Sequence, residues 1–381
     1  MKYISAILVV FLLLAIPSAA EEGTAMTLHA PCALLMAGDG TVLMEKNARE
    51  KREPASVTKI MTILLTMEAL QEGAIRLEDV VTATDHACSL GGSQIWMRQG
   101  EQFTVEELLK CVAVASANDC ATLLGEHISG TEEAFVAKMN QRAAELGMKD
   151  TCFVNCCGLP AAGHLTTAYD IGLMTCELLK HPQILEYTGI WTDTIRGGAF
   201  GLTNTNKLIR SYPGLNGMKT GYTAAAGYCI SATALREDLQ LIAVVMAEPG
   251  IEQRSQDVTA LLNYGFANYK MVTVTPEHPV MSVPVERGRA DRVLCTLEKP
   301  AGLLMSKSQA GSYTQDLELM PTVQAPVRAG DALGTLVIRC EGVELARLPV
   351  VAAEDVAALS MGDCFSRIFL CFTGQKLHSK L

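Results

Sequence analysis

Ser56 and Lys59 form the first pair of side chains in this sequence that could do chemistry together. They lie three residues apart at the start of a predicted helix, so both side chains share one helix face. A serine hydroxyl becomes a strong nucleophile when a neighbouring base accepts its proton, and a desolvated lysine amine can serve as that base. The same spacing also fits a helix cap followed by a surface lysine, so the pair alone does not settle the chemistry.

Two other short motifs carry groups that could complete such a site. Ser116-Ala117-Asn118 follows an apolar helical run; its serine is a candidate proton relay, and its asparagine a candidate for holding a substrate amide. Lys219-Thr220-Gly221 supplies a cation, a hydroxyl and a glycine that lets a ligand approach a strand backbone closely. A strand edge with free N–H groups can bind an extended peptide. Each motif alone also fits an ordinary turn or helix end.

The segments around these motifs predict a domain of mixed helices and strands. The first motif opens an apolar helix at residues 56–71, whose apolar side chains nearly encircle it, which is typical of a buried core helix. Residues 239–246 have the pattern of a buried strand paired with residues 228–233. The other predicted helices lie near residues 105–114 and 132–146, and two further strands near residues 30–36 and 41–44.

A second region begins after Tyr269, where helical periodicity disappears. Short β-rich runs alternate there with glycine and proline, which predicts a small all-β domain over residues 272–352 with its boundary region at 272–279. Residues 21–271 are then expected to form the catalytic domain. The predicted strands of the second region are residues 280–285, 292–297, 316–320, 335–339 and 343–348.

Residues 1–20 have the features of a secretory signal peptide. Lys2 provides a positive charge, residues 4–16 are almost wholly apolar, and Ser18-Ala19-Ala20 offers small residues for cleavage after Ala20. The apolar run is shorter than the roughly 20 residues that span a bilayer, which favours a signal peptide over an uncleaved anchor. We therefore expect export to the cell envelope, at the outer face of the cytoplasmic membrane.

The C-terminal residues 353–381 predict an amphipathic helix. Asp363 is a candidate cap, and Arg367, Lys376 and Lys380 add positive charge. The helix is too short to cross a bilayer, so we expect it to lie at the membrane surface, the alternative being a helix docked on its own domain. Four apolar residues follow helical spacing and share one face: Phe365, Ile368, Phe369 and Phe372.

Composition excludes some classes of ligand. The formal net charge of −10 gives no electrostatic basis for binding nucleic acid. The 13 cysteines are odd in number and many lie inside apolar patterns, so we expect mostly free thiols that pack as small hydrophobic groups. The sequence has neither a repeated Cys-x-x-Cys nor a His-x-x-x-His spacing, so no zinc site is expected, and no cofactor either.

Ser-x-x-Lys, Ser-x-Asn and Lys-Thr-Gly, in this order along the chain, match the signature set of β-lactamases and penicillin-binding proteins. With this set, the sequence resembles the low-molecular-mass penicillin-binding proteins that have D-alanyl-D-alanine carboxypeptidase activity. The resemblance covers nearly the whole mature chain. It rests on residues 54–62, 92–97, 100–101, 104–105, 107–109, 116–119, 158–160, 163–164, 167–170, 217–223 and 226–229.

The resemblance implies a role for each motif residue. Ser56 is implied to be the acylated nucleophile and Lys59 its base, with the backbone N–H groups of Ser56 and Tyr222 forming the oxyanion hole. Arg254 has the family's spacing for an arginine that binds the substrate's terminal carboxylate, for which a bidentate guanidinium is suited. An ordinary surface arginine is the alternative. The residues implied to line the two walls of the cleft are Ser116 and Asn118, and Lys219, Thr220 and Gly221.

Some positions depart from the family pattern without removing a catalytic group. Tyr222 stands where some relatives have histidine, Ala224 where many have aspartate, and Cys156-Cys157 where polar residues are more usual. These departures bear on substrate preference. His164 is a tempting base, but the three-motif mechanism does not need it, and we expect a buried structural role.

The implied fold is the penicillin-binding protein or β-lactamase-like transpeptidase fold, of the α+β class, in which helices flank an antiparallel sheet. The implied function is removal of the terminal D-Ala from peptidoglycan stem peptides, with β-lactams as covalent inhibitors. A class A β-lactamase is the nearest alternative, but the Glu-x-x-Leu-Asn segment that it needs is missing. Transpeptidation is a further alternative, and so is a non-catalytic wall-binding protein, which would have no use for an intact nucleophile and base.

Overall fold

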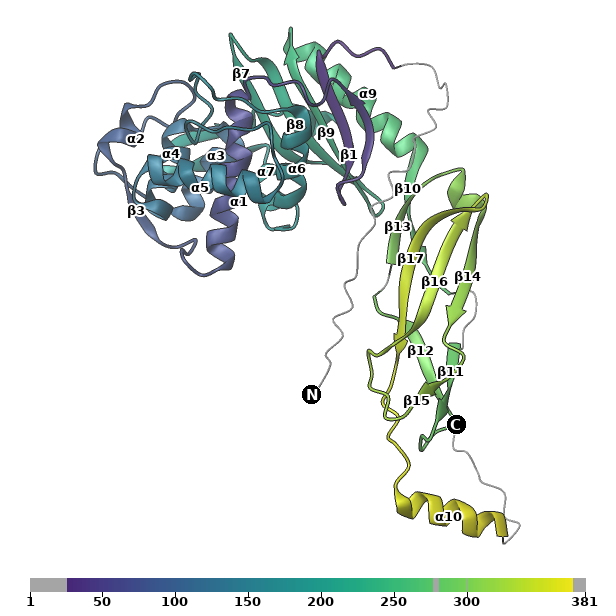
Figure 1. Ribbon diagram of the computed structural model, residues 1–381. Helices are drawn as coiled ribbons and strands as arrows, with labels where there is room; N and C mark the ends of the chain where they lie inside the picture. The colour runs from purple at the N-terminus through teal and green to yellow at the C-terminus, as the bar shows by residue number, and fades with distance from the viewer. Residues whose placement is uncertain (1–25, 277–280, 300, 373–381) are drawn as a thin grey trace.

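The computed structural model describes residues 26–276, 281–299 and 301–372 (Figure 1). The predicted signal peptide at residues 1–20 lies outside these ranges. The described chain forms a domain with helices on a five-stranded sheet, then an elongated all-β domain, then a helix at the far end. The α+β class predicted from the sequence is confirmed.

The sheet of the first domain has the strand order β2-β1-β9-β8-β7, and all neighbouring strands are antiparallel. β8 and β9 pair along nearly their whole length, which confirms the pairing predicted from the sequence. β7 pairs with β8 alone and therefore forms one edge of the sheet. The strands are β1 Cys32–Ala37, β2 Val42–Lys46, β7 Leu215–Thr223, β8 Gly227–Arg236 and β9 Leu239–Glu248.

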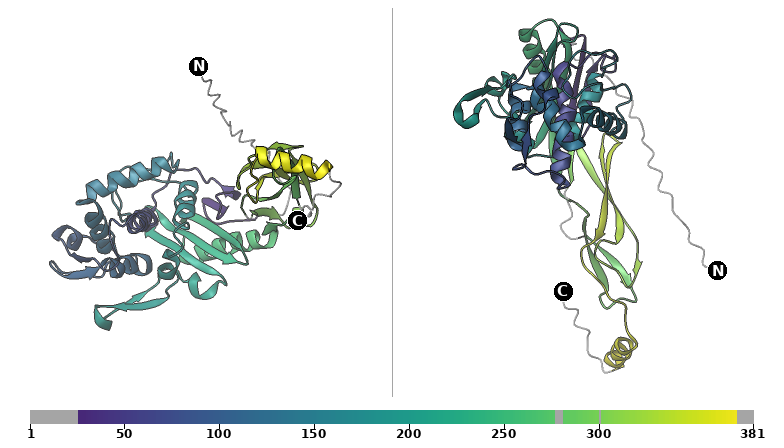
Figure 2. Two further views of the ribbon diagram at one scale, coloured as in Figure 1. Left: turned by 90° about the horizontal axis from the view of Figure 1, so that it is seen from below. Right: turned by 90° about the vertical axis from the view of Figure 1, so that its left-hand side faces the viewer.

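Helices cover both faces of this sheet. Side chains alternate between the two faces along each strand, and apolar side chains on both faces need to be buried. Leu34 and Val244 point into the larger core, which also contains residues of α1 and α6. Leu35 and Val245 point into the smaller core, against α9. The covering helices are α1 Lys59–Gln71, α6 Ala168–Leu178 and α9 Ile251–Asn268 (Figures 1 and 2).

α1 is the central helix of the larger core, and 10 of its 13 residues are buried, which explains its apolar side chains on every face. It is preceded by a 3-10 turn, η1 Ala55–Thr58, so Ser56 lies on this turn and the predicted helix begins three residues too early. The remaining helices of the domain are α2 Asp85–Ser89, α3 Val105–Ala115, α4 Asn118–Ser129, α5 Glu132–Glu145, α7 Ile184–Thr188 and α8 Leu208–Ser211. Two small two-stranded sheets pair β3 Val80–Thr82 with β4 Gln102–Thr104, and β5 Thr192–Ile195 with β6 Phe200–Thr203.

The second domain is all-β, as predicted, and extends away from the first domain (Figures 1 and 2). It contains a six-stranded sheet in the order β14-β16-β17-β12-β11-β15 and a separate antiparallel pair. That pair, β10 Tyr269–Val274 with β13 Ala301–Ser306, is absent from the sequence prediction. The strands of the larger sheet are β11 Met281–Glu286, β12 Arg292–Leu297, β14 Tyr313–Leu319, β15 Val323–Gln324, β16 Ala332–Cys340 and β17 Val343–Ala352.

The last described element, α10 Met361–Phe372, lies at the end of the β domain far from the first domain (Figure 1). The Ser360 hydroxyl accepts the Asp363 N–H (3.2 Å), and the Asp363 carboxylate accepts the Ser360 N–H (2.8 Å). The sequence predicted Asp363 as the helix cap, but Ser360 is the cap. Asp363 is the acidic residue that completes a capping box with Ser360. Phe365 of the predicted apolar face is exposed, and the side chains of its other members lie outside the described set. Within the described ranges, no helix is both long and apolar enough to span a bilayer.

Candidate active site

Two glycine backbones from distant parts of the chain hold the turn that carries Ser56. A Cβ atom at Gly158 would lie 1.8 Å from the Ala55 carbonyl oxygen, and one at Gly221 would lie 2.9 Å from the Ser56 amide nitrogen. Any side chain at either position would therefore collide with the turn. Gly221, predicted to let a ligand approach the strand, thus also lets the Ser56 turn pack against the edge strand β7.

Lys59 is completely buried, and its ammonium group has three hydrogen-bond acceptors. Its Nζ donates to Ser56 Oγ (2.9 Å), to Asn118 Oδ1 (2.6 Å) and to the Cys157 carbonyl oxygen (2.6 Å). All three acceptors are neutral. Burial lowers the pKa of Lys59, because the charged ammonium loses its hydration. The predicted contact between nucleophile and base is therefore present in the structure.

Ser116 and Asn118 lie where α3 ends and α4 begins, and both are buried. Ser116 adopts a left-handed conformation (φ 63°) that ends α3. The Asn118 side chain bridges Lys59 and the loop at Gly91, since its Nδ2 donates to the Gly91 carbonyl oxygen (2.7 Å). Within the described part of the chain, no direct hydrogen bond joins Ser116 to Lys59, so the predicted relay has no preformed link to the base.

The other wall of the site is β7, where Lys219 and Thr220 are both buried. Lys219 Nζ donates to the Thr220 carbonyl oxygen (2.9 Å), and Thr220 Oγ1 donates to the Thr205 hydroxyl (2.7 Å). Burial lowers the pKa of Lys219 well below its usual value, and the nearby positive charges of Lys59 and Arg254 lower it further. Basic side chains from three elements therefore gather at one place.

Arg254 lies in the first turn of α9 and is only 6% exposed, so the alternative of a surface arginine is wrong. It makes no ion pair with a described residue, and its Nε is buried without a hydrogen-bond partner. Its guanidinium carbon lies 6.0 Å from the centre of the Tyr228 ring. Tyr228 stacks in turn on Tyr222, which is 55% exposed (ring centres 4.3 Å apart). A buried cation without a counter-ion is the feature of an anion-binding site.

The Cys156-Cys157 segment holds the third acceptor of Lys59. The Asn155 side chain accepts the N–H groups of the residues at 157, 158 and 159, which curls this segment around it. Glu132 Oε1 accepts the Cys156 N–H (3.0 Å), and Thr62 donates to the Cys156 carbonyl oxygen (2.5 Å). These bonds fix the direction of the Cys157 carbonyl group. Sequence reasoning missed this acceptor, since a backbone carbonyl leaves no residue pattern.

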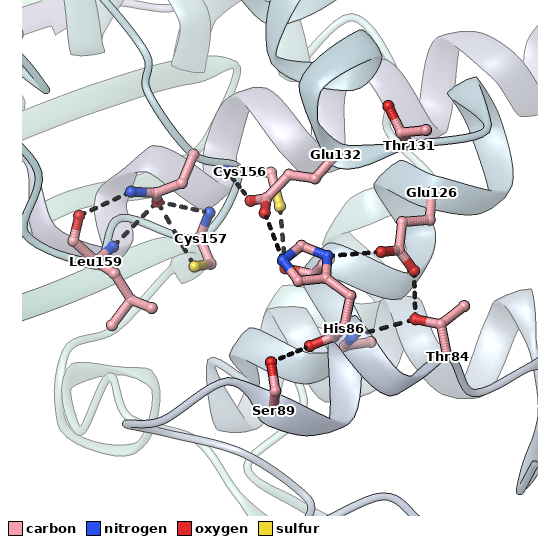
Figure 3. Close-up of polar contacts among 12 residues, drawn as sticks. Thr84, His86, Ser89, Glu126, Thr131, Glu132, Cys156, Cys157 and Leu159 are labelled. Carbon is pink, nitrogen blue, oxygen red and sulfur yellow. Dashed lines mark hydrogen bonds and ion pairs between the residues drawn. The ribbon is translucent and has the colours of Figure 1, made fainter. Parts of the chain in front are cut away.

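Glu132 belongs to a polar network with Thr84, His86 and Glu126 (Figure 3), in which the His86 side chain is partly exposed. His86 lies between Glu126 and Glu132, with Nδ1 2.7 Å from Glu126 Oε1 and Nε2 3.4 Å from Glu132 Oε2. Thr84 also donates to Glu126 (2.6 Å). The hydrogen bond from His86 to Glu126 raises the pKa of the histidine, although burial opposes this.

His164 has the structural role that was predicted. It is buried, its Nε2 lies 2.8 Å from the Thr58 hydroxyl, and its Nδ1 accepts the Val154 N–H (3.1 Å). Burial lowers the pKa of His164 to about 4, so the ring is neutral at physiological pH. The cysteines within the described ranges are all free thiols, as expected.

The fold and the site together define a class of enzyme. A serine hydroxyl is hydrogen-bonded to a buried lysine amine, beside a cationic edge strand of a helix-covered antiparallel sheet. This is the arrangement of a serine acyl-transfer enzyme.

Similarity to known proteins covers almost the whole chain. Residues 18–250 match the family model of D-alanyl-D-alanine carboxypeptidase (peptidase S11), and residues 269–358 match the C-terminal domain of penicillin-binding protein 5. D-alanyl-D-alanine carboxypeptidase DacF of Bacillus subtilis (strain 168) is 42% identical over 334 residues, 86% of each chain. Penicillin-binding protein 5 from Haemophilus influenzae superposes with a TM-score of 0.76 at 28% identity, over 88% of this chain and 99% of that one. Penicillin-binding protein D2 from Listeria monocytogenes, in its ampicillin-bound form, superposes with a TM-score of 0.58 at 32% identity, over 63% of this chain and 99% of that one.

The chain therefore belongs to the D-alanyl-D-alanine carboxypeptidase family, the low-molecular-mass penicillin-binding proteins, which are serine hydrolases. The family, fold and type of activity predicted from the sequence are confirmed. The similarity supports this function over a class A β-lactamase and over a non-catalytic wall-binding protein.

Proposed function

We propose that the protein removes the terminal D-alanine of peptidoglycan stem peptides by way of an acyl-enzyme on Ser56. One contact carries the proposal: Lys59 Nζ lies 2.9 Å from Ser56 Oγ. Lys59 is completely buried, and none of its three hydrogen-bond acceptors is a carboxylate. Burial without a paired anion favours the neutral amine, which is the form that can accept a proton from the serine.

In the acylation half, the Lys59 amine takes the Ser56 proton while Oγ attacks the carbonyl carbon of the penultimate D-Ala. The backbone N–H groups of Ser56 and Tyr222 stabilise the resulting oxyanion. The peptide C–N bond then breaks, and the leaving amine takes the proton back from Lys59 with Ser116 as relay. In the second half, water attacks the ester carbon, Lys59 accepts the proton of that water, and Ser56 Oγ regains it on release.

The terminal carboxylate of the substrate is expected to bind where Lys219, Thr220 and Arg254 meet. Burial lowers the pKa of Lys219, and positive charge on Lys59 and Arg254 lowers it further. An arriving carboxylate relieves this repulsion, so substrate binding becomes favourable at this end of the cleft. The edge strand β7 can at the same time pair with the extended peptide backbone.

The direct test is release of D-alanine from a diacetyl-Lys-D-Ala-D-Ala peptide. Ser56→Ala should lower the rate by more than about 1000-fold, because no other group can form the acyl-enzyme. Ser308→Ala, which changes an exposed serine of the β domain, is the matched control and should leave the rate unchanged. Retained release by Ser56→Ala would show that the assignment is wrong.

β-Lactams are proposed as covalent inhibitors of the same serine. The Listeria monocytogenes penicillin-binding protein D2 of similar fold has been solved in an ampicillin-bound form. The ring carbonyl of a penicillin would take the place of the penultimate D-Ala carbonyl, and its carboxylate that of the substrate terminus.

We further propose that residues 1–20 direct export and that α10 holds the enzyme at the outer face of the cytoplasmic membrane. α10 has 12 described residues, about 18 Å of helix, against a hydrocarbon core of about 30 Å. Met361 and Phe365 are 74% and 68% exposed. Phe365→Asp should weaken sedimentation with anionic phospholipid vesicles, whereas Val343→Asp, at an exposed apolar site of the β domain, should not. Equal binding of the two variants to the vesicles would count against membrane anchoring by α10. A secreted chain that retains Met1 would count against a cleaved signal peptide.

A further inference from the structure

Glu248 is a buried acid behind the carboxylate-binding end of the site. It is the last residue of β9, opposite Tyr228 of β8, and it is 1% exposed. Neither carboxyl oxygen receives a hydrogen bond from an N–H or hydroxyl group of the described residues. An ionised carboxylate in such a place would be costly, because it would lose its hydration without gaining a donor.

The Glu248 carboxyl group instead lies against the carboxyl group of Asp257, on α9. Asp257 has two donors of its own: the Ala30 N–H (2.8 Å to Oδ2) and His29 Nδ1 (2.8 Å to Oδ1). Two carboxyl groups in contact cannot both be ionised, and they form a hydrogen bond only when one of them carries a proton. The donors on Asp257 stabilise its charge, so the proton belongs on Glu248.

The direction of each pKa agrees with this geometry. Burial raises the pKa of Glu248 to about 8, and the neighbouring charge of Asp257 adds to the effect. The pKa of Asp257 is lowered: burial alone would raise it, but the hydrogen bonds from Ala30 and His29 outweigh burial. Glu248 is therefore a neutral acid at neutral pH and Asp257 an anion.

Arg254 is the charged neighbour that matters for binding. It lies one turn before Asp257 on α9, close enough for its charge to act on Glu248, yet the two form no ion pair. The Arg254 guanidinium is thus left without a carboxylate partner among the described residues. The other titratable or charged groups around Glu248 are Lys46 of β2, Tyr228 and Cys229 of β8, and His29 beyond Asp257.

We propose that Glu248 is a positioning residue for the carboxylate-binding site: in its neutral form it leaves Arg254 free to bind the substrate's terminal carboxylate, and in its ionised form it competes for Arg254. The proposal rests on the proposed role of Arg254 in binding that carboxylate. When pH rises, Glu248 gives its proton to bulk water and becomes a second buried anion beside Arg254. Substrate affinity then falls while the Ser56 and Lys59 end is untouched, so KM rises and kcat does not respond.

The coupling must be reciprocal, because a bound substrate carboxylate and the Glu248 proton affect each other by the same free energy. An anion at Arg254 makes ionisation of Glu248 less favourable. If bound substrate raises the pKa of Glu248 by about one unit, KM rises about tenfold once Glu248 is ionised.

The test compares the full-length wild-type enzyme with Glu248→Gln, which keeps the shape of the neutral acid. Values of kcat and KM for diacetyl-Lys-D-Ala-D-Ala are measured from about pH 7 to about pH 9.5, a range that spans the Glu248 titration. We expect the ratio of wild-type KM to Glu248→Gln KM to rise about tenfold across this range, with the kcat ratio constant. Taking the ratio cancels the titration of Lys59 and Lys219, which both enzymes share. A KM ratio that stays constant would overturn the proposal.

Two further measurements keep the outcome decisive. If Glu248→Gln does not fold, an infrared titration of the wild-type enzyme can show whether a buried carboxylic acid band present near pH 7 disappears above about pH 9. Loss of that band supports the proposal, and its absence at pH 7 overturns it. Arg254→Ala at about pH 7 separates the two hypotheses: an unchanged KM means that the role of Arg254 is wrong, whereas a raised KM with a constant Glu248→Gln ratio refutes the role of Glu248 alone.

Discussion

The two ends of the candidate active site differ in whether their buried basic side chains have hydrogen-bond partners. At the nucleophile end, the Lys59 side-chain nitrogen has three hydrogen-bond partners, namely Ser56 Oγ, Asn118 Oδ1 and the Cys157 carbonyl oxygen. At the carboxylate end, Arg254 is nearly as buried, but it has no ion-pair partner in the described chain and its Nε has no acceptor. Buried polar groups are normally paired, so we expect a bound substrate to supply the partner that Arg254 lacks.

This contrast predicts that the two ends affect different kinetic constants. Groups at the nucleophile end act on the reacting atoms and should change kcat. Groups at the carboxylate end act on binding and should change KM. Substitutions at each end of the site test this separation.

Lys59→Met should give the largest loss, because it removes the proton acceptor while keeping much of the apolar volume. We expect kcat to fall by about 1000-fold, within the range that general-base catalysis supplies. D-alanine release and the rate of penicillin acylation would both measure it. A thermal melt controls for folding, since removing a buried amine leaves the acceptors on Asn118 and Cys157 unpaired. A folded variant that retains a tenth of the wild-type kcat would show that Lys59 is not the proton acceptor.

Arg254→Ala should raise KM about 10- to 100-fold and change kcat by less than about threefold, because a charge-assisted pair with the substrate carboxylate is lost. Arg254→Lys keeps the charge but not the planar guanidinium group, so its KM should lie between those of the wild type and of Arg254→Ala. Steady-state kinetics on the same peptide measures both variants. A fall in kcat at unchanged KM would show that Arg254 acts on the reacting atoms and not on substrate binding.

Glu132→Gln should have a smaller effect on kcat, about three- to tenfold, because it weakens the bond that holds the Cys156 N–H and so loosens the acceptor at Cys157. Glu133→Gln changes the exposed neighbour on the same helix and serves as the control. Equal kcat values for the two variants would show that the network of Figure 3 does not support the Lys59 site.

Glu248→Gln should change stability in a pH-dependent way. The folded state keeps the Glu248 proton up to about pH 8, whereas an unfolded glutamate loses it above about pH 4.3. Wild-type stability therefore falls as pH rises through this interval, and the glutamine variant escapes the loss. The melting temperature of the variant relative to wild type should rise by a few degrees between about pH 5 and about pH 9. Glu252→Gln, at an exposed site on α9, should show no such trend. If the melting temperatures of Glu248→Gln and wild type differed by the same amount at both pH values, Glu248 would not carry a buried proton.

Side-chain patterns predicted much of the fold. The alternation in β8 and β9 and the apolar run of α1 locate the central sheet and its core helix, because their burial dictates their composition. The pair of β10 and β13 escaped prediction, since β10 is only partly buried and β13 contains a glycine. The start of α1 was also wrong: the chain turns through a 3-10 conformation at Ser56, and no residue preference distinguishes that turn from a first helical turn.

The candidate site was predictable where side chains carry it. The structure brings Ser56 and Lys59 together as expected. It also shows that Arg254 is buried, whereas the sequence left a surface position as an alternative. The Cys157 carbonyl acceptor and the buried acid Glu248 could not be predicted. A backbone acceptor has no sequence signal, and the burial of an acid depends on which strands and helices close over it.

Ser56 is proposed to be the nucleophile, activated by the buried amine of Lys59. Incubation of the wild-type enzyme with labelled penicillin, followed by peptide mass spectrometry, would identify the residue that is acylated. We predict one covalent adduct, located on the peptide that contains Ser56, absent in Ser56→Ala and formed about 1000-fold more slowly in Lys59→Met. An adduct on another residue, or no adduct at all, would rule out Ser56 as the nucleophile.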